Sequence, residues 1–169
     1  MKIKTVITAA AISLLTFAGT LYGAAVDRKD IMEKKQWDIK GSCTFGDKLF
    51  RTKGKVYMVS KEIYPVNTRQ IWLLRGAIRS KSKTPGKIRV GFRPLNAKEK
   101  AYTKDIWCCD FVKASKRWKD VGGGISLVDK AENENITAQW DKNVKYTKVV
   151  IEAEGEMEVI EFALEILEE

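Results

Sequence analysis

The feature that most constrains this fold is a repeated alternation of apolar and polar residues with a period of two. Between residues 37 and 45 the apolar side chains occupy odd positions, namely Trp37, Ile39, Cys43 and Phe45. Similar alternating or β-branched segments recur at 56–59, 71–79, 88–95, 102–112, 125–128, 136–140 and 148–153. Short strands split by Gly, Asn, Asp and Lys predict an all-β chain, a single antiparallel β-sandwich over residues 37–169. Periodicity does not choose between a jelly-roll and an immunoglobulin-like topology.

The two ends of this region have less distinct patterns. Residues 26–36 are polar and fit either a short helix or a disordered lead. Residues 157–167 fit a strand or a helix, because both arrangements place Ile160 and Leu164 on one apolar face. Glu154-Gly155 resembles a hairpin turn between two alternating segments, which favours the strand.

Residues 1–25 have the pattern of a signal peptide. Lys2 and Lys4 precede an apolar segment, and small residues at Gly23 and Ala25 suit cleavage after Ala25. The alternative is a retained anchor, but the apolar segment is short for a membrane span of about 20 residues. We therefore expect a periplasmic or secreted protein with no membrane span after cleavage.

The chain of 169 residues contains no histidine. This absence excludes a Ser-His-Asp triad, a Cys-His dyad and any histidine-ligated metal site. The glycine triplet 122–124 lacks the Lys-Ser/Thr ending of a phosphate loop. We expect no cofactor and no metal and assign no catalytic residue. A hydrolase that uses two carboxylates on a carbohydrate remains an alternative.

The three cysteines are interpreted through strand parity. Cys43 and Cys109 share faces with tryptophan and phenylalanine, so we expect both to face the core and to form a disulfide in an oxidising compartment. Cys108 is then the free thiol. It is either a buried, inert residue, the site of an intermolecular bridge, or a reactive group.

Charge is divided unevenly along the chain. Lys and Arg number 31 against 22 Asp and Glu. Residues 26–120 carry 25 basic and 10 acidic residues, whereas residues 121–169 carry 4 and 12. Because no linker separates them, we expect the acidic segment to pack within the same domain and to neutralise part of the basic one.

A cluster of arginines is the main candidate binding site. Pairing segments 71–79 and 88–95 as a hairpin would bring together four outward arginines, Arg75, Arg79, Arg89 and Arg93. The loop lysines Lys81, Lys83 and Lys87 would add positive charge. Such a face could bind an anionic polymer. The alternative is internal pairing with the alternating glutamates of the acidic segment, Glu152, Glu154, Glu156 and Glu158. Trp118, among basic residues, is a weaker candidate for stacking on a sugar.

These observations favour a non-enzymatic binding or accessory protein of the bacterial envelope. Its expected partner is an anionic polysaccharide or an acidic protein surface, and nucleic acid is disfavoured by export. The hydrolase is one alternative. A structural subunit that assembles through Cys108 or an edge strand is another.

Overall fold

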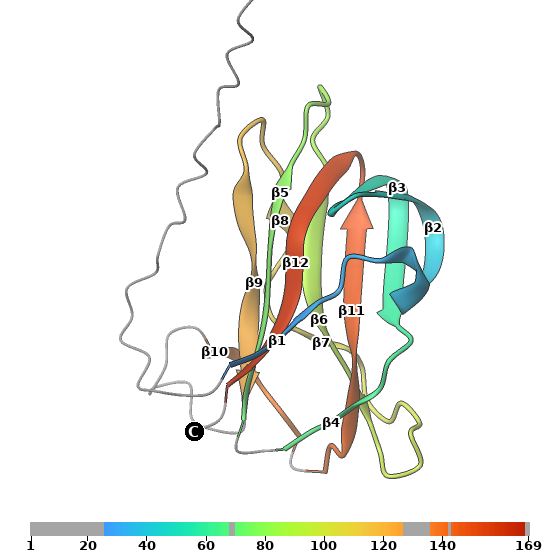
Figure 1. Cartoon of the computed structure of the whole chain (residues 1–169), viewed down its shortest axis with the longest axis vertical. Coiled ribbons are helices and arrows are strands. Elements are labelled where there is room, and N and C mark those ends of the chain that lie inside the picture. The colour runs from blue at the N-terminus through green and yellow to red at the C-terminus, as the bar shows by residue number, and fades with distance from the viewer. Residues whose placement is uncertain (1–25, 68–69, 127–135, 142, 168–169) are drawn as a thin grey trace, which may run out of the picture.

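The computed structural model describes residues 26–67, 70–126, 136–141 and 143–167, and the expected signal peptide lies outside them. The described residues form strands joined by turns, with one short 3-10 helix, η1 (Lys34–Gln36). The strands are β1 (Val26–Asp30), β2 (Trp37–Gly46), β3 (Leu49–Ser60), β4 (Tyr64–Pro65), β5 (Ile71–Arg79), β6 (Lys87–Leu95), β7 (Ile106–Trp107), β8 (Val112–Lys113), β9 (Lys119–Ser126), β10 (Ile136–Gln139), β11 (Tyr146–Glu154) and β12 (Met157–Leu167). The all-β prediction is confirmed (Figure 1).

The strands form the two layers of a β-sandwich, whose long strands run along the long axis of the molecule (Figure 1). One layer has the order β10-β9-β5-β12, with β1 also paired to β12. The other has the order β2-β3-β11-β6-β7, with β4 and β8 as short additions. β3 pairs with β12 through its first half and with β11 through its second half, so it connects the layers at one side. All named pairs are antiparallel except β10 with β9.

The core lies between the layers and is built around aromatic residues. Trp72 in β5 makes edge-to-face contacts with Phe92 in β6 and with Trp140, at centroid distances of 6.1 and 6.0 Å. Because β5 and β6 share no ladder of hydrogen bonds, the contact between Trp72 and Phe92 crosses the sandwich. Buried aromatic pairs of this geometry add to the hydrophobic stabilisation of a core.

The hairpin expected between segments 71–79 and 88–95 is not formed. Both segments are strands within a residue of the expected bounds, but β5 pairs with β12 and β9 whereas β6 pairs with β11, β7 and β8. The connection between them crosses from one layer to the other. It is held by other segments, since the Ser80 amide donates to the Ser115 carbonyl at 2.7 Å.

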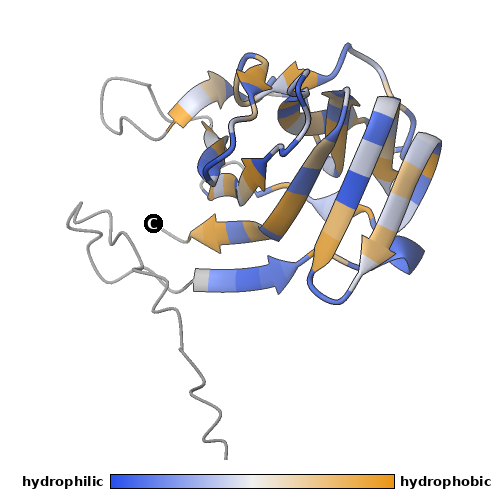
Figure 2. Cartoon of the chain, turned by 90° about the horizontal axis from the view of Figure 1, so that it is seen from above, coloured by the Kyte–Doolittle hydropathy of each residue, from blue (hydrophilic) through white to orange (hydrophobic). Residues whose placement is uncertain are grey.

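The C-terminal segment is a strand, as favoured. The expected hairpin at Glu154-Gly155 is not formed, because β11 and β12 do not pair with each other and β3 lies between them in the strand order. The connection between them contains Gly155 at a φ of 89°, a conformation that glycine adopts at low cost. The Gly155 amide donates to the Gly54 carbonyl at 2.8 Å. The polar lead 26–36 is ordered, and a short helix is present only as η1 at its end. Its first part is β1, which pairs along β12, where its hydrophilic surface lies beside a hydrophobic strand (Figure 2).

Candidate functional site

The four arginines of the expected basic face lie on two opposite surfaces. Arg75 and Arg79 point outward from β5, and Arg89 and Arg93 point outward from β6 in the other layer, because their neighbours Leu74, Ile78, Ile88, Val90 and Phe92 face the core. No four-arginine patch therefore forms. The expected pairing of the two strands was wrong because Ile78 and Val90 are both buried, and this burial fits strands in facing layers as well as paired strands.

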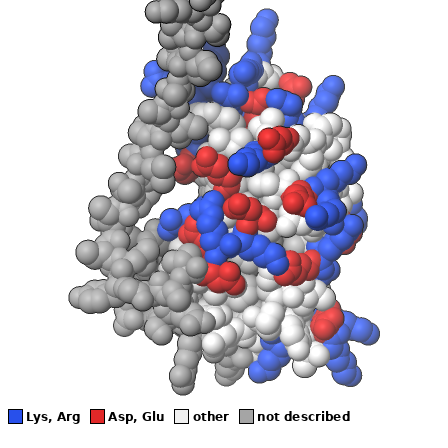
Figure 3. Space-filling view, viewed as in Figure 1, with Lys and Arg blue, Asp and Glu red and all other residues white. Residues whose placement is uncertain are grey.

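Each arginine contacts a carboxylate, but only Arg79 and Arg89 contact a glutamate of the set that the internal-pairing alternative named. Arg79 donates to Glu158 at 2.6 Å, and Arg75 lies 3.6 Å from Glu165. The Arg79 guanidinium is the largest cause that lowers the pKa of Glu158. Figure 3 shows the resulting interleaving of acidic and basic side chains over one face of the molecule.

Arg89 lies between a carboxylate and two aromatic rings. Its Nε donates to Glu152 at 2.8 Å, and its guanidinium lies 4.0 Å from the Trp107 ring centroid and 4.6 Å from that of Phe111. Two aromatic faces and one carboxylate leave this cation little capacity for an external anion. Arg89 therefore fixes the segment that contains β7 and β8 onto the sandwich.

The remaining basic and aromatic candidates are scattered. Lys87 forms an ion pair with Glu154 at 3.0 Å, and Lys81 and Lys83 are exposed between β5 and β6. Trp118 is 38% exposed, and the Arg79 guanidinium lies 4.3 Å from its ring centroid. The arginine thus covers part of the surface that a sugar would stack on.

The three cysteines are free thiols in this structure. Cys43 lies in β2 and Cys109 follows β7, so β3, β11 and β6 separate them in the strand order. At about 4.8 Å per strand this separation is roughly 19 Å, far more than a disulfide spans. The Cys43–Cys109 bridge is therefore not formed.

The cysteine parity also requires correction. Cys108 is fully buried and Cys109 only partly so, because the chain turns after Trp107 and ends the alternation. Burial raises the pKa of the Cys108 thiol. Cys108 therefore fits the buried, inert interpretation, and its burial argues against an intermolecular bridge.

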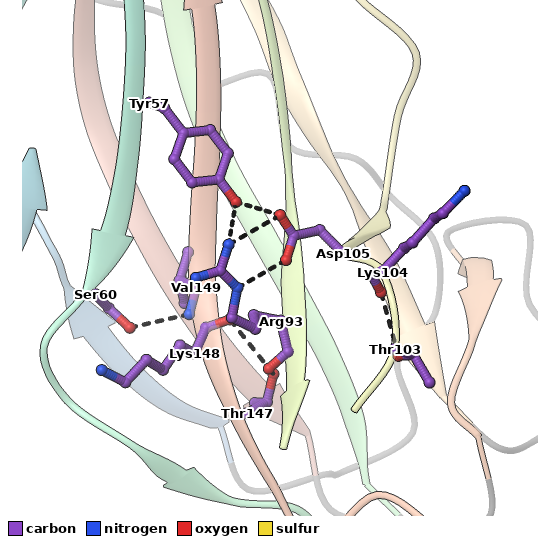
Figure 4. A network of polar contacts seen from close by, with 9 residues as sticks. All are labelled: Tyr57, Ser60, Arg93, Thr103, Lys104, Asp105, Thr147, Lys148 and Val149. Atoms are coloured by element: carbon purple, nitrogen blue, oxygen red, sulfur yellow. Dashed lines mark hydrogen bonds and ion pairs between the residues drawn. The ribbon is translucent and has the colours of Figure 1, made fainter. Parts of the chain in front are cut away.

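A compact polar network lies on the outer face of the layer that contains β3, β11 and β6. Arg93 extends from β6 across β11 toward β3 (Figure 4). Its guanidinium donates to Asp105 at 2.9 Å and to the Tyr57 hydroxyl at 2.6 Å. The Tyr57 hydroxyl in turn donates to Asp105. The three side chains, drawn from three separate segments, hold one another in place.

The network has consistent electrostatic effects. Burial, followed by the Asp105 carboxylate, raises the pKa of the Tyr57 hydroxyl. The hydrogen bond to Asp105 raises the pKa of Arg93. Tyr57 therefore stays neutral and Arg93 stays charged across the physiological range.

Two hollows adjoin the Tyr57 ring. The first, of about 320 Å³, is lined by Asp38, Ile39, Lys40, Tyr57, Val59 and Arg93. The second, of about 290 Å³, is lined by Lys40, Gly41, Lys55, Val56, Tyr57, Glu152, Ala153 and Glu154. Lys40 and Tyr57 belong to both, so we describe the two hollows together as the Tyr57 groove. Along β3 it extends from Val59 to Lys55, roughly 13 Å at the rise of a strand.

The sequence pattern singled out Arg93, Glu152 and Glu154 among the residues of this groove, but not Tyr57, Lys40 or Lys55. The expected strand 56–59 does place Tyr57 between two buried neighbours, Val56 and Met58, so an outward aromatic residue could have been noticed. The part played by Asp105 had no such signal. It comes from the segment before β7, and only the folded chain brings it to Arg93.

The described residues contain no group of three or more Cys, Asp and Glu side chains arranged to hold a metal ion. Within the same residues, no helix has the length and apolar character needed to cross a membrane.

Comparisons with known proteins identify the fold. No family model matches the sequence, and no curated protein matches it. Among solved structures, the chain is similar to the CBM22-1 xylan-binding domain of Xyn10C from Paenibacillus barcinonensis, with a TM-score of 0.57 and 9% sequence identity. The match covers 86% of this chain and 97% of that domain. At this identity the likeness shows the architecture alone: the chain is a β-sandwich of the kind found in that domain.

Proposed function

We propose that this protein is a non-enzymatic binding protein of the bacterial envelope that holds a segment of polysaccharide in the Tyr57 groove. The observation that carries the proposal is the groove itself, in which two adjoining hollows share one aromatic ring. Volumes of about 320 and 290 Å³ lie at the lower end of the roughly 300–1,000 Å³ typical of small-ligand sites. Each hollow suits a unit of modest size, such as one sugar ring.

The lining suits a sugar. A pyranose ring has an apolar C–H face and a rim of hydroxyl groups, and an aromatic ring with polar neighbours complements both. Tyr57 supplies the ring. Lys40 and Asp38 supply a donor and an acceptor beside it, both on exposed side chains of β2.

The Tyr57 ring is fixed before any ligand arrives. Its hydroxyl is bound to Arg93 and Asp105, so little side-chain freedom is lost on binding. Arg93 is itself held to β11 by a neighbouring hydrogen bond, in which the Thr147 hydroxyl donates to the Arg93 carbonyl at 3.1 Å (Figure 4). Preorganisation of this kind supports a binding role for the face.

Two further observations support the proposal. The similar solved structure is a xylan-binding domain, so a β-sandwich of this size is compatible with polysaccharide binding. The signal-peptide pattern of residues 1–25 would place the protein where such polymers occur. Protein recovered from the periplasm or medium should begin at Val26 by mass spectrometry. A chain that still begins at residue 1 would contradict export with cleavage.

Affinity electrophoresis through gels that contain individual polysaccharides tests the binding role. The expected result is retarded migration in at least one polysaccharide gel. Tyr57→Leu should abolish the retardation because it removes the ring and keeps an apolar side chain, whereas Tyr57→Phe should retain most of it. Tyr146→Leu is the matched control, since Tyr146 is a partly exposed tyrosine of β11 that lines neither hollow.

Two results would contradict the proposal. Equal migration of the wild type and Tyr57→Leu in every polysaccharide gel would show that the groove binds none of these polymers. Release of reducing sugar by the wild type would instead favour the carboxylate-based hydrolase. Circular dichroism of each variant ensures that lost retardation does not reflect unfolding.

A further inference from the structure

The charges in the Tyr57 groove are not balanced. In the second hollow, Glu152 and Glu154 each already have a cation from β6, Arg89 and Lys87 respectively. The Lys87 ammonium is the largest cause that lowers the pKa of Glu154, so this carboxylate is ionised at neutral pH. Both acidic groups of the hollow are therefore neutralised from within the layer.

Two lysines of the same hollow form no direct ion pair. Lys40 and Lys55 are exposed and line it, and none of the ion pairs between described residues includes either of them. Lys55 lies opposite Glu154 in the strand register and contributes to lowering the pKa of Glu154, which Lys87 already binds directly. Around this hollow four cations face two carboxylates, so two positive charges are in excess.

The first hollow differs in charge. Arg93 is paired with Asp105, and the exposed Asp38 lines the same hollow as the shared Lys40. Over both hollows, with Lys40 counted once, five cations face four carboxylates, so the excess of positive charge lies on the side of Lys55. The groove therefore has one nearly neutral half and one cationic half, with the Tyr57 ring between them. A ligand that matches it carries an uncharged sugar beside an acidic one.

The strand register places both lysines close to the aromatic ring. Lys40 pairs directly with Tyr57 across β2 and β3. Lys55 lies two residues before Tyr57 on the same side of β3, at a strand distance of roughly 7 Å. A sugar stacked on Tyr57 would thus have an ammonium group on two sides of its rim.

From this placement, and resting on the proposed saccharide-binding function, we propose that the groove binds an acidic polysaccharide and that Lys40 and Lys55 bind the anionic group of one sugar unit. The expected ligands share an anionic substituent on a pyranose ring, which is either a carboxylate or a sulfate. A lysine ammonium is a compact charge that binds both through hydrogen bonds and charge attraction.

Isothermal titration calorimetry of the mature protein tests the proposal with three probes. These are a uronic-acid oligosaccharide, a sulfated oligosaccharide, and the uronic-acid oligosaccharide after reduction of its carboxyl groups. We expect tighter binding of a charged probe than of the reduced one, with affinity that falls as salt rises. The preferred charged probe identifies the source of the anionic group.

Variants separate this site from general attraction between a basic protein and a polyanion. Lys40→Gln and Lys55→Gln should each weaken binding of the charged probe about two- to fivefold, in line with single exposed charge pairs. Lys53→Gln is the matched control. It removes the same charge from an exposed position of β3 that lines neither hollow, and it should leave affinity unchanged.

The outcomes distinguish this inference from the function on which it rests. Equal affinity for the charged and reduced probes, with sensitivity to Tyr57→Leu only, would overturn the role of the lysines and retain saccharide binding. Equal weakening by Lys53→Gln would also overturn it, since the attraction would then be nonspecific. Binding of no saccharide at all would overturn both proposals.

Discussion

Asp105→Asn should destabilise the fold by disrupting the network with Arg93 and Tyr57. The side chains of Arg93 and Asp105 are 29% and 16% exposed, so their ion pair lies between the surface and the interior. Breaking a fully buried pair costs about 3–5 kcal/mol, whereas an exposed pair contributes about 0.2–1 kcal/mol. We expect a loss of about 1–2 kcal/mol, because asparagine keeps part of the hydrogen bonding and solvent screens part of the charge.

Urea unfolding followed by tryptophan fluorescence measures this loss. The midpoint should fall while the slope m stays constant, because the surface exposed on unfolding is unchanged. For a domain of this size the melting temperature should fall by about 2–8 °C. Asp110→Asn is the matched control, since it makes the same substitution at an exposed position five residues later.

A double-mutant cycle measures the coupling between Asp105 and Tyr57 within this network. If the three side chains act as one unit, the losses caused by Asp105→Asn and Tyr57→Phe should not add, with a coupling energy above about 0.5 kcal/mol. The reasoning is refuted if Asp105→Asn is as stable as Asp110→Asn. It is also refuted if the two losses add within error, because Tyr57 and Asp105 would then act independently.

Three further predictions concern Glu158, the cysteines and Gly155. The pKa of Glu158 is lowered from its ordinary value of 4.5, chiefly by Arg79. The ionised carboxylate therefore stabilises the fold above that pH, and this stabilisation is lost as the pH falls. Glu158→Gln should accordingly reduce the loss of unfolding free energy toward acid pH. In the native protein, mass spectrometry should detect no alkylation at the buried Cys108. Burial raises the pKa of Cys43 to about 11, so alkylation of Cys43 should increase as the pH approaches that value. Gly155→Ala should lower the unfolding free energy by about 1–3 kcal/mol in urea titrations, since its φ is 89° and a Cβ there would lie 2.8 Å from the Cα of Gly86. Unchanged stability would show that the backbone at Gly155 relaxes.

Sequence periodicity predicted most of the long strands because side-chain alternation is a local property, but the expected strand 102–112 was wrong, since only the two-residue strands β7 and β8 form there. Residues 71–79 are β5 as expected, and residues 157–167 form a strand despite their helical propensity. Alternation specifies which face a side chain occupies but not which strand lies beside it. The β5–β6 hairpin was wrong for this reason, since the buried faces of Ile78 and Val90 belong to opposing layers.

The candidate site was less accessible to such reasoning. Sequence charge identified the four arginines, and the alternating glutamates correctly indicated that some would be paired within the chain. Lys40 and Tyr57 are brought together by the pairing of the consecutive strands β2 and β3, which was not predicted although it is local in sequence. Glu152 and Glu154 reach the same groove through β11, by contacts between segments about 100 residues apart, which no local pattern encodes.

The positions of β11 and β12 have a consequence for how the chain reaches this fold. β11 lies between β3 and β6, and β12 lies between β5 and the pair β1 and β3. Both layers thus receive a central strand from residues 146–167. Neither layer can be completed by the residues that precede this segment, so both layers close only when β11 and β12 are in place.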